Sequence, residues 1–352
     1  MESNKVNQII SSAVEYIKEP HFGLQGFGKV ALDLYDLHRE LNPVYSKYDK
    51  GPLKDWREIP LMPIGEFKKG DVGITLSERM PFPGVEFHSS GTTAKDKSKH
   101  RMFDTEAYRA SIANCFDFFV TEITPPTHRV ILLTPKLANS SLYYMMSYIS
   151  EMKDSRGFRE EFDGMTDPQR VRDFIEELKN EDEPVLLFGT SLAFYDLKTT
   201  IEGLGLDKVE LPINSLFIET GGWKGRDIKL TPSELTNWIA DYFYIPKISA
   251  IREYSMSEIS SQMYSWENEE PVKYSFPEWL AVRCVDPLTQ TEVEDGESGI
   301  ISFVDLANVW SCPFILTEDV GHFEDGVLVL EGRAINAPEK GCSLTYAEAM
   351  GS

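Results

Sequence analysis

The sequence has few cysteines, no long apolar run and no excess of basic residues. Its four cysteines, Cys115, Cys284, Cys312 and Cys342, are too far apart for a CxxC metal knuckle, and they predict reduced thiols. No stretch approaches the roughly 20 apolar residues of a membrane-spanning helix. The formal net charge of −22 excludes a broad nucleic-acid-binding surface, because phosphate backbones attract clustered Lys and Arg. These features favour a soluble, cytoplasmic, enzyme-like chain with no membrane span and no nucleic-acid partner.

In the N-terminal segment no basic region is followed by a continuous apolar segment, so no secretory signal is expected there. Instead, apolar residues between Val6 and Ile17 recur at helical spacing and predict an amphipathic first helix. The sequence contains no internal repeat, low-complexity segment or long linker. A chain of 352 residues can bury a large core, as one α/β unit or as two domains.

Apolar β-rich runs alternate with helical patterns from residue 129 to about residue 262. The predicted strands are residues 129–134, 184–190, 214–220 and 247–251. Two of the helices between them have clear start signals, Asp167 before a proline and a capping box at Thr231. Continuous apolar strands separated by helices predict a largely parallel sheet with helices on its faces.

The pattern changes after Pro271 to shorter strands separated by turns, including a turn at Asp325-Gly326. We therefore predict an α/β fold whose main sheet is joined by a smaller β-rich subdomain at about residues 272–333. The two parts are expected to pack as one unit over residues 1–333, followed by a tail at residues 334–352.

A loop rich in small hydroxyls, FHSSGTTAKDKSKH, occupies residues 87–100. Glycine lets the backbone approach a phosphate closely, hydroxyls donate hydrogen bonds to its oxygens, and lysines balance its charge. The Walker A pattern does not fit, because no glycine directly precedes a Lys-Ser/Thr pair. The residue types indicate either a phosphate-binding loop or a solvated surface loop. His100 at its end is more typical of a structural histidine than of a phosphate contact.

This loop resembles the nucleotide-phosphate loop of the adenylate-forming superfamily, which includes acyl-CoA synthetases and firefly luciferase. Members of the superfamily activate a carboxylate with ATP and form an acyl-adenylate and pyrophosphate. The resemblance implies catalytic roles for Thr92 and Lys99. The nucleotide-binding residues that it implies in the loop are Ser89, Ser90, Gly91, Thr92, Thr93, Lys95 and Ser98.

Residues 253–258, EYSMSE, resemble the superfamily's aromatic-Gly-x-Thr-Glu segment, with Ser255 and Ser257 replacing the usual glycine and threonine. The resemblance implies that Tyr254 lies on adenine and that Glu258 helps to hold Mg²⁺, a cation that prefers carboxylate and phosphate oxygens. Without its context, the segment would be interpreted as a helix start with a capping serine.

Two later segments follow in the order that the superfamily requires. Thr317-Glu318-Asp319 is similar to a Thr-Gly-Asp segment, which implies that Asp319 accepts hydrogen bonds from the ribose hydroxyls, although a turn explains it equally well. Gly332-Arg333 is similar to the Gly-Arg pair that ends the large domain, where Arg333 would reach the nucleotide.

Gly221-Gly222, directly after a predicted strand, resembles the glycine pair that lines the adenine side of the pocket. A plain strand-to-loop turn explains the pair nearly as well. Its position beyond the carboxyl end of a parallel strand is typical of a ligand crevice.

The C-terminal residues resemble one particular family within this superfamily. Only 19 residues follow Arg333, so the usual C-terminal small domain with its catalytic lysine is expected to be absent. A short adenylating core that ends in Lys340-Gly341-Cys342-Ser343-Leu344 is similar to the acyl-protein synthetase (LuxE) family. In that family a fatty acyl group passes from the adenylate to a cysteine near the C-terminus and then to a partner reductase. The resemblance implies that Cys342 accepts the acyl group.

Three functions remain open from the sequence. The first is a fatty-acid–protein ligase that uses ATP, Mg²⁺, Cys342 and an acyl-CoA reductase-type partner protein. The second is an acyl- or aryl-CoA ligase of the phenylacetate-CoA ligase type, with free CoA as the acceptor. The third is a non-catalytic nucleotide-binding subunit, which the departures at Ser255, Ser257 and Glu318 keep open. Cys115 and Cys312 lie in apolar surroundings and are expected to pack in the core.

Overall fold

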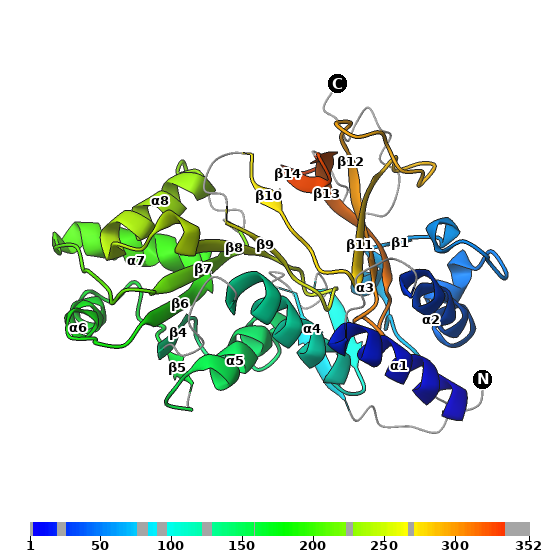
Figure 1. The fold of residues 1–352 in the computed structure, drawn as a ribbon, viewed down its shortest axis with the longest axis horizontal. Helices are drawn as coiled ribbons and strands as arrows, with labels where there is room; N and C mark the ends of the chain where they lie inside the picture. The colour runs from blue at the N-terminus through cyan, green and yellow to red at the C-terminus, as the bar shows by residue number, and fades with distance from the viewer. Residues whose placement is uncertain are drawn as a thin grey trace.

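Among the described residues, two six-stranded sheets lie side by side, one in an α/β part and the other in a β-rich part (Figure 1). The computed structural model describes residues 3–19, 26–75, 84–89, 97–121, 129–157, 159–222, 228–266 and 271–334. Within these ranges, no helix combines the length and the apolar character needed to cross a bilayer.

The first sheet has the strand order β5-β4-β6-β7-β8-β9. Neighbouring strands from β5 to β8 pair in parallel, and β9 pairs antiparallel to β8. Its strands are β4 (Arg129–Leu133), β5 (Glu160–Glu161), β6 (Val185–Thr190), β7 (Leu216–Thr220), β8 (Ala250–Tyr254) and β9 (Met263–Ser265). The predicted parallel sheet is confirmed. The strand predicted from residue 247 begins only at Ala250, because Lys247–Ser249 forms a 3-10 turn, η4.

Helices cover both faces of this sheet, which explains its continuous apolar strands. Alternate strand residues such as Val130 and Leu132 belong to the core cluster that contains α4 and α5 side chains, whereas Ile131 and Leu133 pack with α6, α7 and α8. The helices are α4 (Glu106–Phe116), α5 (Ser141–Lys153), α6 (Pro168–Lys179), α7 (Ser191–Leu204) and α8 (Pro232–Phe243). A short π-helix, η3 (Asp117–Thr121), extends α4.

Two predicted helix starts have the expected caps. The Asp167 carboxylate accepts hydrogen bonds from the first-turn amides of α6. Thr231 and Glu234 form the reciprocal capping box of α8, with a proline at its first turn. Such caps satisfy amides that have no partner inside the helix.

The second sheet has the order β10-β14-β13-β12-β11, with β1 pairing in parallel to β13. Its strands are β1 (Met62–Pro63), β10 (Lys273–Tyr274), β11 (Leu280–Val285), β12 (Gly299–Asp305), β13 (Phe314–Glu324) and β14 (Val327–Arg333). Asp325 and Gly326 both have positive φ, 51° and 80°, as a tight hairpin turn between β13 and β14 requires. The sequence prediction missed β13, and Thr317-Glu318-Asp319 lies within this strand rather than in a turn.

The N-terminal residues join the two parts. The predicted first helix, α1 (Ser3–Lys18), is confirmed, and its apolar face is buried from Val6 to Ile17. It is followed by α2 (Phe27–Leu41), η1 (Tyr45–Tyr48), η2 (Trp56–Glu58), α3 (Glu66–Lys69), and the hairpin of β2 (Val85–His88) and β3 (Lys99–Met102).

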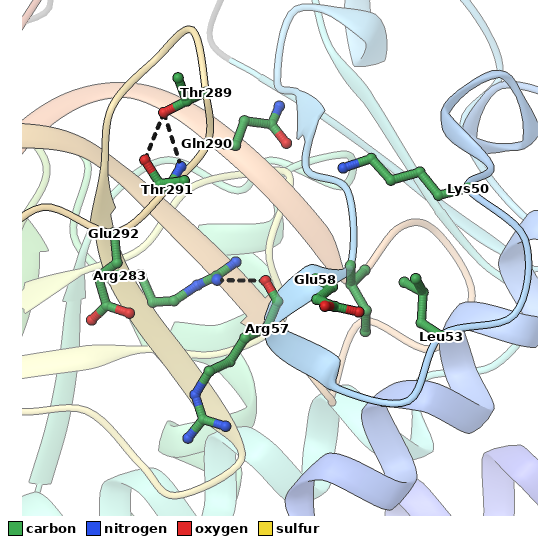
Figure 2. A pocket seen from close by; sticks show the side chains of 10 residues that line it. Lys50, Leu53, Arg57, Glu58, Arg283, Thr289, Gln290, Thr291 and Glu292 are labelled. Atoms are coloured by element: carbon green, nitrogen blue, oxygen red, sulfur yellow. Dashed lines mark hydrogen bonds between the residues drawn. The ribbon is translucent and has the colours of Figure 1, made fainter.

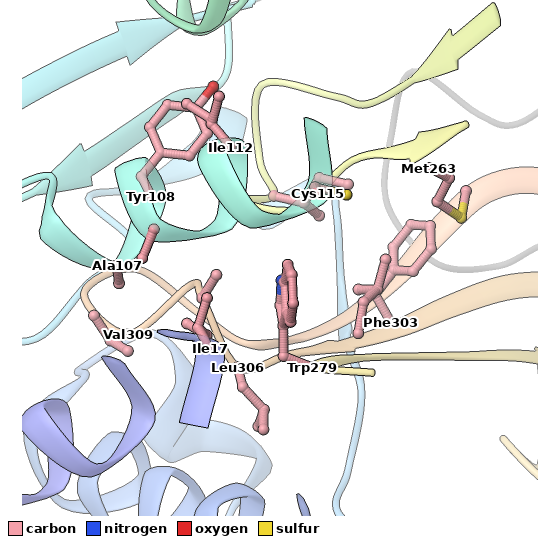
Figure 3. Close-up of a cluster of buried hydrophobic side chains, with 14 of the residues drawn as sticks. Ile17, Ala107, Tyr108, Ile112, Cys115, Met263, Trp279, Phe303, Leu306 and Val309 are labelled. Carbon is pink, nitrogen blue, oxygen red and sulfur yellow. The ribbon is translucent and has the colours of Figure 1, made fainter. Parts of the chain in front are cut away.

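One buried cluster connects both sheets and α1. Trp279, at the start of the second part, packs among α4 side chains such as Ile112 and side chains of the second sheet such as Phe303 (Figure 3). Its indole N–H lies 3.0 Å from Ser111 Oγ on α4 and 3.1 Å from Ser261 Oγ. Side chains of the two parts therefore belong to one buried cluster.

Candidate active site

The end of β8 meets β13 and β14, and three predicted nucleotide-binding residues come together there. The Tyr254 hydroxyl donates a hydrogen bond to Asp319 Oδ2 at 2.6 Å. Asp319 lies opposite Arg333 in the register of β13 and β14. Arg333 forms an ion pair with Glu318 at 2.9 Å, and its side chain is still 69 % exposed. Glu318, which stands at the glycine position of the similar Thr-Gly-Asp segment, is therefore a direct partner of Arg333.

Glu258 is buried close to this cluster, in the turn between β8 and β9. Burial raises the pKa of its carboxyl, while the nearby Ser98 side chain and the charges of Lys68 and Arg333 oppose the rise in pKa. Ser98 lies at the end of the hydroxyl loop. The structure therefore brings the predicted metal ligand next to the predicted phosphate loop.

The base of the hydroxyl loop is closed by two hydrogen bonds between its ends. The Ser98 amide donates to Ser89 Oγ at 2.9 Å, and the Ser89 amide donates to the Ser98 carbonyl at 3.1 Å. These bonds continue the β2–β3 hairpin, in which Lys99 pairs with His88. The role of Lys99 stays a prediction. Ser90, Gly91, Thr92, Thr93, Lys95 and the tail residue Cys342 lie outside the described residues.

A buried network supports the turn that carries Glu258. His100 Nδ1 lies 2.6 Å from the Ser257 carbonyl oxygen, and Nε2 lies 2.9 Å from Asn308 Oδ1. The Asn308 amide donates at 2.8 Å to each of the Glu258 and Cys312 carbonyls. Burial lowers the pKa of His100 to about 4, so the ring is neutral at pH 7. The preferred structural interpretation of His100 is confirmed by its burial, and the network contacts the carbonyl oxygens of both Ser257 and Glu258.

A cavity of about 340 Å³ lies between the carboxyl ends of β7 and β8 and the strands β10 and β14. Gly221, directly after β7, lines it together with Gly332, and Gly222 is exposed beside it. Gly221 has a φ of 77°, which favours glycine at this turn. One glycine from each predicted pair, Gly221 and Gly332, therefore lines the same cavity.

Sequence reasoning missed the acidic residues at the floor of this cavity. Glu253 is buried, and burial raises the pKa of its carboxyl to about 7. The Thr220 hydroxyl donates to one carboxyl oxygen, and the other has no hydrogen-bond partner in the described part of the chain. Glu219 accepts a hydrogen bond from the Ser191 hydroxyl, whose oxygen also lies 2.9 Å from the Gly221 carbonyl oxygen. Acidic residues at the ends of apolar strands were the signal that could have revealed them.

The three described cysteines are buried core residues rather than nucleophiles. The core interpretation of Cys115 and Cys312 is confirmed. Burial raises the pKa of Cys284 and Cys312 to about 12, which suppresses the reactive thiolate. No cluster of three or more His, Cys, Asp or Glu side chains among the described residues could hold a metal ion by itself.

The fold is that of the adenylate-forming enzymes. It is similar to crystal structures of 2-hydroxyisobutyryl-CoA ligase. An open conformation in complex with 2-HIB-AMP and CoA has a TM-score of 0.63 and 12 % identity, covering 89 % of this chain and 76 % of the ligase. The postadenylation state with 2-HIB-AMP also has a TM-score of 0.63 at 12 % identity, covering 87 % and 67 %.

The sequence then places the chain within this class. The family model of acyl-protein synthetase, LuxE, matches residues 159–351, more than half of the chain, and the chain belongs to this family. It is 29 % identical over 188 residues to a long-chain-fatty-acid–luciferin-component ligase of Aliivibrio fischeri, covering 49 % of this chain and 48 % of that relative. The Vibrio harveyi ligase is 28 % identical over 144 residues, covering 38 % of each. The chain thus spans at most about half the length of these relatives.

Proposed function

We propose that this protein activates a fatty acid with ATP and then carries the acyl group on its own Cys342. In the first step a carboxylate oxygen attacks the α-phosphorus of ATP, and the bond from that phosphorus to pyrophosphate breaks. In the second step the Cys342 thiolate attacks the acyl carbon and AMP leaves, which forms a thioester. A reductase-type partner protein would then receive the acyl group.

The observation that carries the first step is the joint position of Tyr254, Asp319 and Arg333. These residues come from three strands and were each predicted to contact the nucleotide. In the proposed complex the adenine lies near Gly221 and Tyr254, and the ribose hydroxyls donate to Asp319. Arg333 keeps an exposed guanidinium available for the phosphates. Positioning and charge stabilisation would supply most of the rate enhancement.

The donor set fits a bound Mg²⁺ at Glu258. Magnesium in nucleotide enzymes is commonly held by one or two carboxylates together with substrate phosphates. Glu258 supplies one such carboxylate beside Ser98, and its raised pKa shows that burial disfavours the charged form in the protein alone. When bound, the cation would neutralise phosphate charge. The protein's own contribution is to hold the Glu258 backbone through His100 and Asn308.

Support for the second step comes from the family. The matched range, residues 159–351, includes Cys342. The curated relatives are named as ligases that join a long-chain fatty acid to a luciferin component. The buried thiols at Cys115, Cys284 and Cys312 are poor competitors, because burial raises the pKa of each one.

The test is intact-mass analysis after incubation with ATP, Mg²⁺ and a mixture of straight-chain fatty acids and aromatic acids. The wild type should gain one acyl group that hydroxylamine removes, and Cys342→Ala should gain none. Both proteins should exchange labelled pyrophosphate into ATP in an acid-dependent manner. Cys312→Ala is the matched control and should acylate like the wild type, provided that it folds.

Other outcomes would point to the alternative functions. Acid-dependent pyrophosphate exchange without an adduct, together with turnover that requires free CoA, would identify a CoA ligase. An absence of exchange with every acid would favour a non-catalytic nucleotide-binding subunit. Equal loss of exchange and acylation in Cys342→Ala would contradict the proposed division of roles.

A further inference from the structure

A second cavity lies at the β11 edge of the second sheet. It measures about 520 Å³ and is lined by residues of the 50–59 segment and of the turn that follows β11 (Figure 2). In the order of the sheet, β12 and β13 lie between β11 and β14, the strand that carries Arg333. Its volume falls within the range of small-molecule sites, roughly 300–1,000 Å³. The proposed adenylation reaction does not use this cavity.

Arg283 on β11 is the unusual residue of this cavity. Its side chain is buried, with 6 % of the residue exposed. One guanidinium N–H donates to the Arg57 carbonyl at 3.0 Å, and the buried Nε has no hydrogen-bond partner among the described residues. No described carboxylate forms an ion pair with it. A buried guanidinium without an anionic partner is unfavourable, which indicates a missing ligand.

The charges around the cavity support this interpretation. Burial lowers the pKa of Arg283, the charge of Arg57 lowers it further, and Glu292 and Asp55 oppose the change in pKa. Asp55 already pairs with Arg57 at 3.4 Å. Figure 2 shows Lys50 across the cavity from Arg283. The Glu292 carboxylate points away from the Arg283 guanidinium. Because Arg57 is paired with Asp55, Lys50 and Arg283 remain in the lining with Glu58 and Glu292, so the cavity is locally balanced in a chain of net charge −22.

The other residues that line the cavity suit a small amphipathic anion. Hydrogen bonds also hold two of the lining segments together. Leu53 and Ile59 provide apolar contact, and Thr289 and Thr291 contribute hydroxyls that lie 2.6 Å apart. Gln290 exchanges two hydrogen bonds with the Leu61 backbone, at 3.0 and 3.1 Å. These bonds fix the turn against the 50–61 segment, so the cavity is preformed.

We propose that this cavity binds a small molecule with an oxyanion head, a phosphate or a carboxylate group, held by the Arg283 guanidinium with Lys50 as the second cation. A guanidinium fork matches both groups, because each presents two oxygens to parallel N–H donors. The ligand would complete the hydrogen bonds of Arg283. This site is separate from the adenylation site and does not depend on the proposed function.

The test compares two probes, inorganic phosphate and hexanoate, in thermal-shift and calorimetric titrations of the full chain. Either probe should raise the melting temperature of the wild type, and the probe that binds more tightly identifies the head group. Arg283→Gln should weaken binding at least about tenfold. The exposed Lys50→Gln should weaken it about two- to fivefold without affecting folding. Arg333→Gln, at the candidate active site, should bind as the wild type does.

A further measurement separates a binding role from a structural one. Without any ligand, Arg283→Met should melt at or above the wild-type temperature, because it removes a buried charge that lacks a partner. The proposal is overturned if Arg283→Met and Arg283→Gln both melt well below the wild type. It is also overturned if neither probe binds, or if binding is lost in Arg333→Gln and kept in both Arg283→Gln and Lys50→Gln.

Discussion

Tyr254 and Asp319, 65 residues apart in the sequence, are joined by a hydrogen bond of 2.6 Å that links the end of the parallel sheet to the antiparallel sheet. Burial raises the pKa of Asp319, and the Tyr254 hydrogen bond and the charge of Arg333 oppose that rise in pKa. The carboxylate is thus held in place between the two sheets before any ligand binds.

Asp319→Ala should raise the KM for ATP about 10- to 100-fold, because a hydrogen bond to a charged group contributes roughly 1.5–3 kcal/mol. Tyr254→Phe keeps the ring and should have a smaller effect on KM, with a loss of about 1 kcal/mol in the free energy of unfolding. Pyrophosphate exchange at varied ATP measures the first effect, and urea unfolding measures the second. Asp173→Ala, on the surface of α6, is the control. An unchanged KM in Asp319→Ala would contradict the ribose role.

Glu253 should make the protein less stable as the pH rises from about 4.5 to about 7. The pKa of its carboxyl is about 7 in the folded state and near 4.5 when unfolded, so the native state binds more protons in this window. The contribution is on the order of 3 kcal/mol or less. Glu253→Gln should remove this part of the slope in urea unfolding between pH 5 and 8. The exposed Glu176→Gln should keep the wild-type slope, and an identical slope in Glu253→Gln would refute the assignment.

His100 should have the opposite pH dependence. Its pKa falls from 6.5 to about 4 on burial, so the unfolded state binds the extra proton and stability is lost as the pH falls through this window. His100→Ala should flatten this acid-side loss and leave one buried acceptor, the oxygen that receives the single N–H of the neutral ring, without its donor, at a cost of about 1–3 kcal/mol. The side chain of His322 is only 17 % exposed, and against the effect of burial its hydrogen bonds to Glu331 and Glu324 raise its pKa, so His322→Ala should not flatten the acid-side loss.

The same substitution tests the positioning role of His100. Because its ring holds the Ser257 carbonyl next to Glu258, His100→Ala should lower kcat for pyrophosphate exchange more than it raises the KM for ATP. His100→Gln, which can still donate one hydrogen bond, should recover part of kcat. A purely structural role would leave kcat per folded molecule unchanged in both variants.

Trp279 should be one of the most sensitive core positions. It joins α4 to the second sheet, so Trp279→Ala should cost about 3–5 kcal/mol in the free energy of unfolding. The shared core predicts a single cooperative transition rather than separate melting of the two sheets. Trp238→Ala, on the partly buried outer side of α8, should cost less than half as much. Two separate transitions in the wild type would show that the two parts unfold independently.

Local patterns were sufficient to predict much of the fold. The capping box at Thr231 and the cap at Asp167 were correct because such caps depend on residues three or four positions apart. The parallel sheet was predicted because strands buried on both faces are continuously apolar. Strand β13 was missed because its carboxyl half, TEDVGHFE, carries several charges, and pairing with β12 and β14 overrides that local preference.

The order and residue types of the predicted nucleotide-binding segments could be recognised in the sequence, since each segment is a short local motif. Which of their groups meet depends on the tertiary fold. In the fold Tyr254 contacts Asp319, Glu318 pairs with Arg333 and His100 contacts the Ser257 carbonyl, while Arg283 is buried without a carboxylate partner among the described residues. Burial and pairing arise from contacts between distant segments, and these contacts shift pKa values and create cavities that no local pattern encodes.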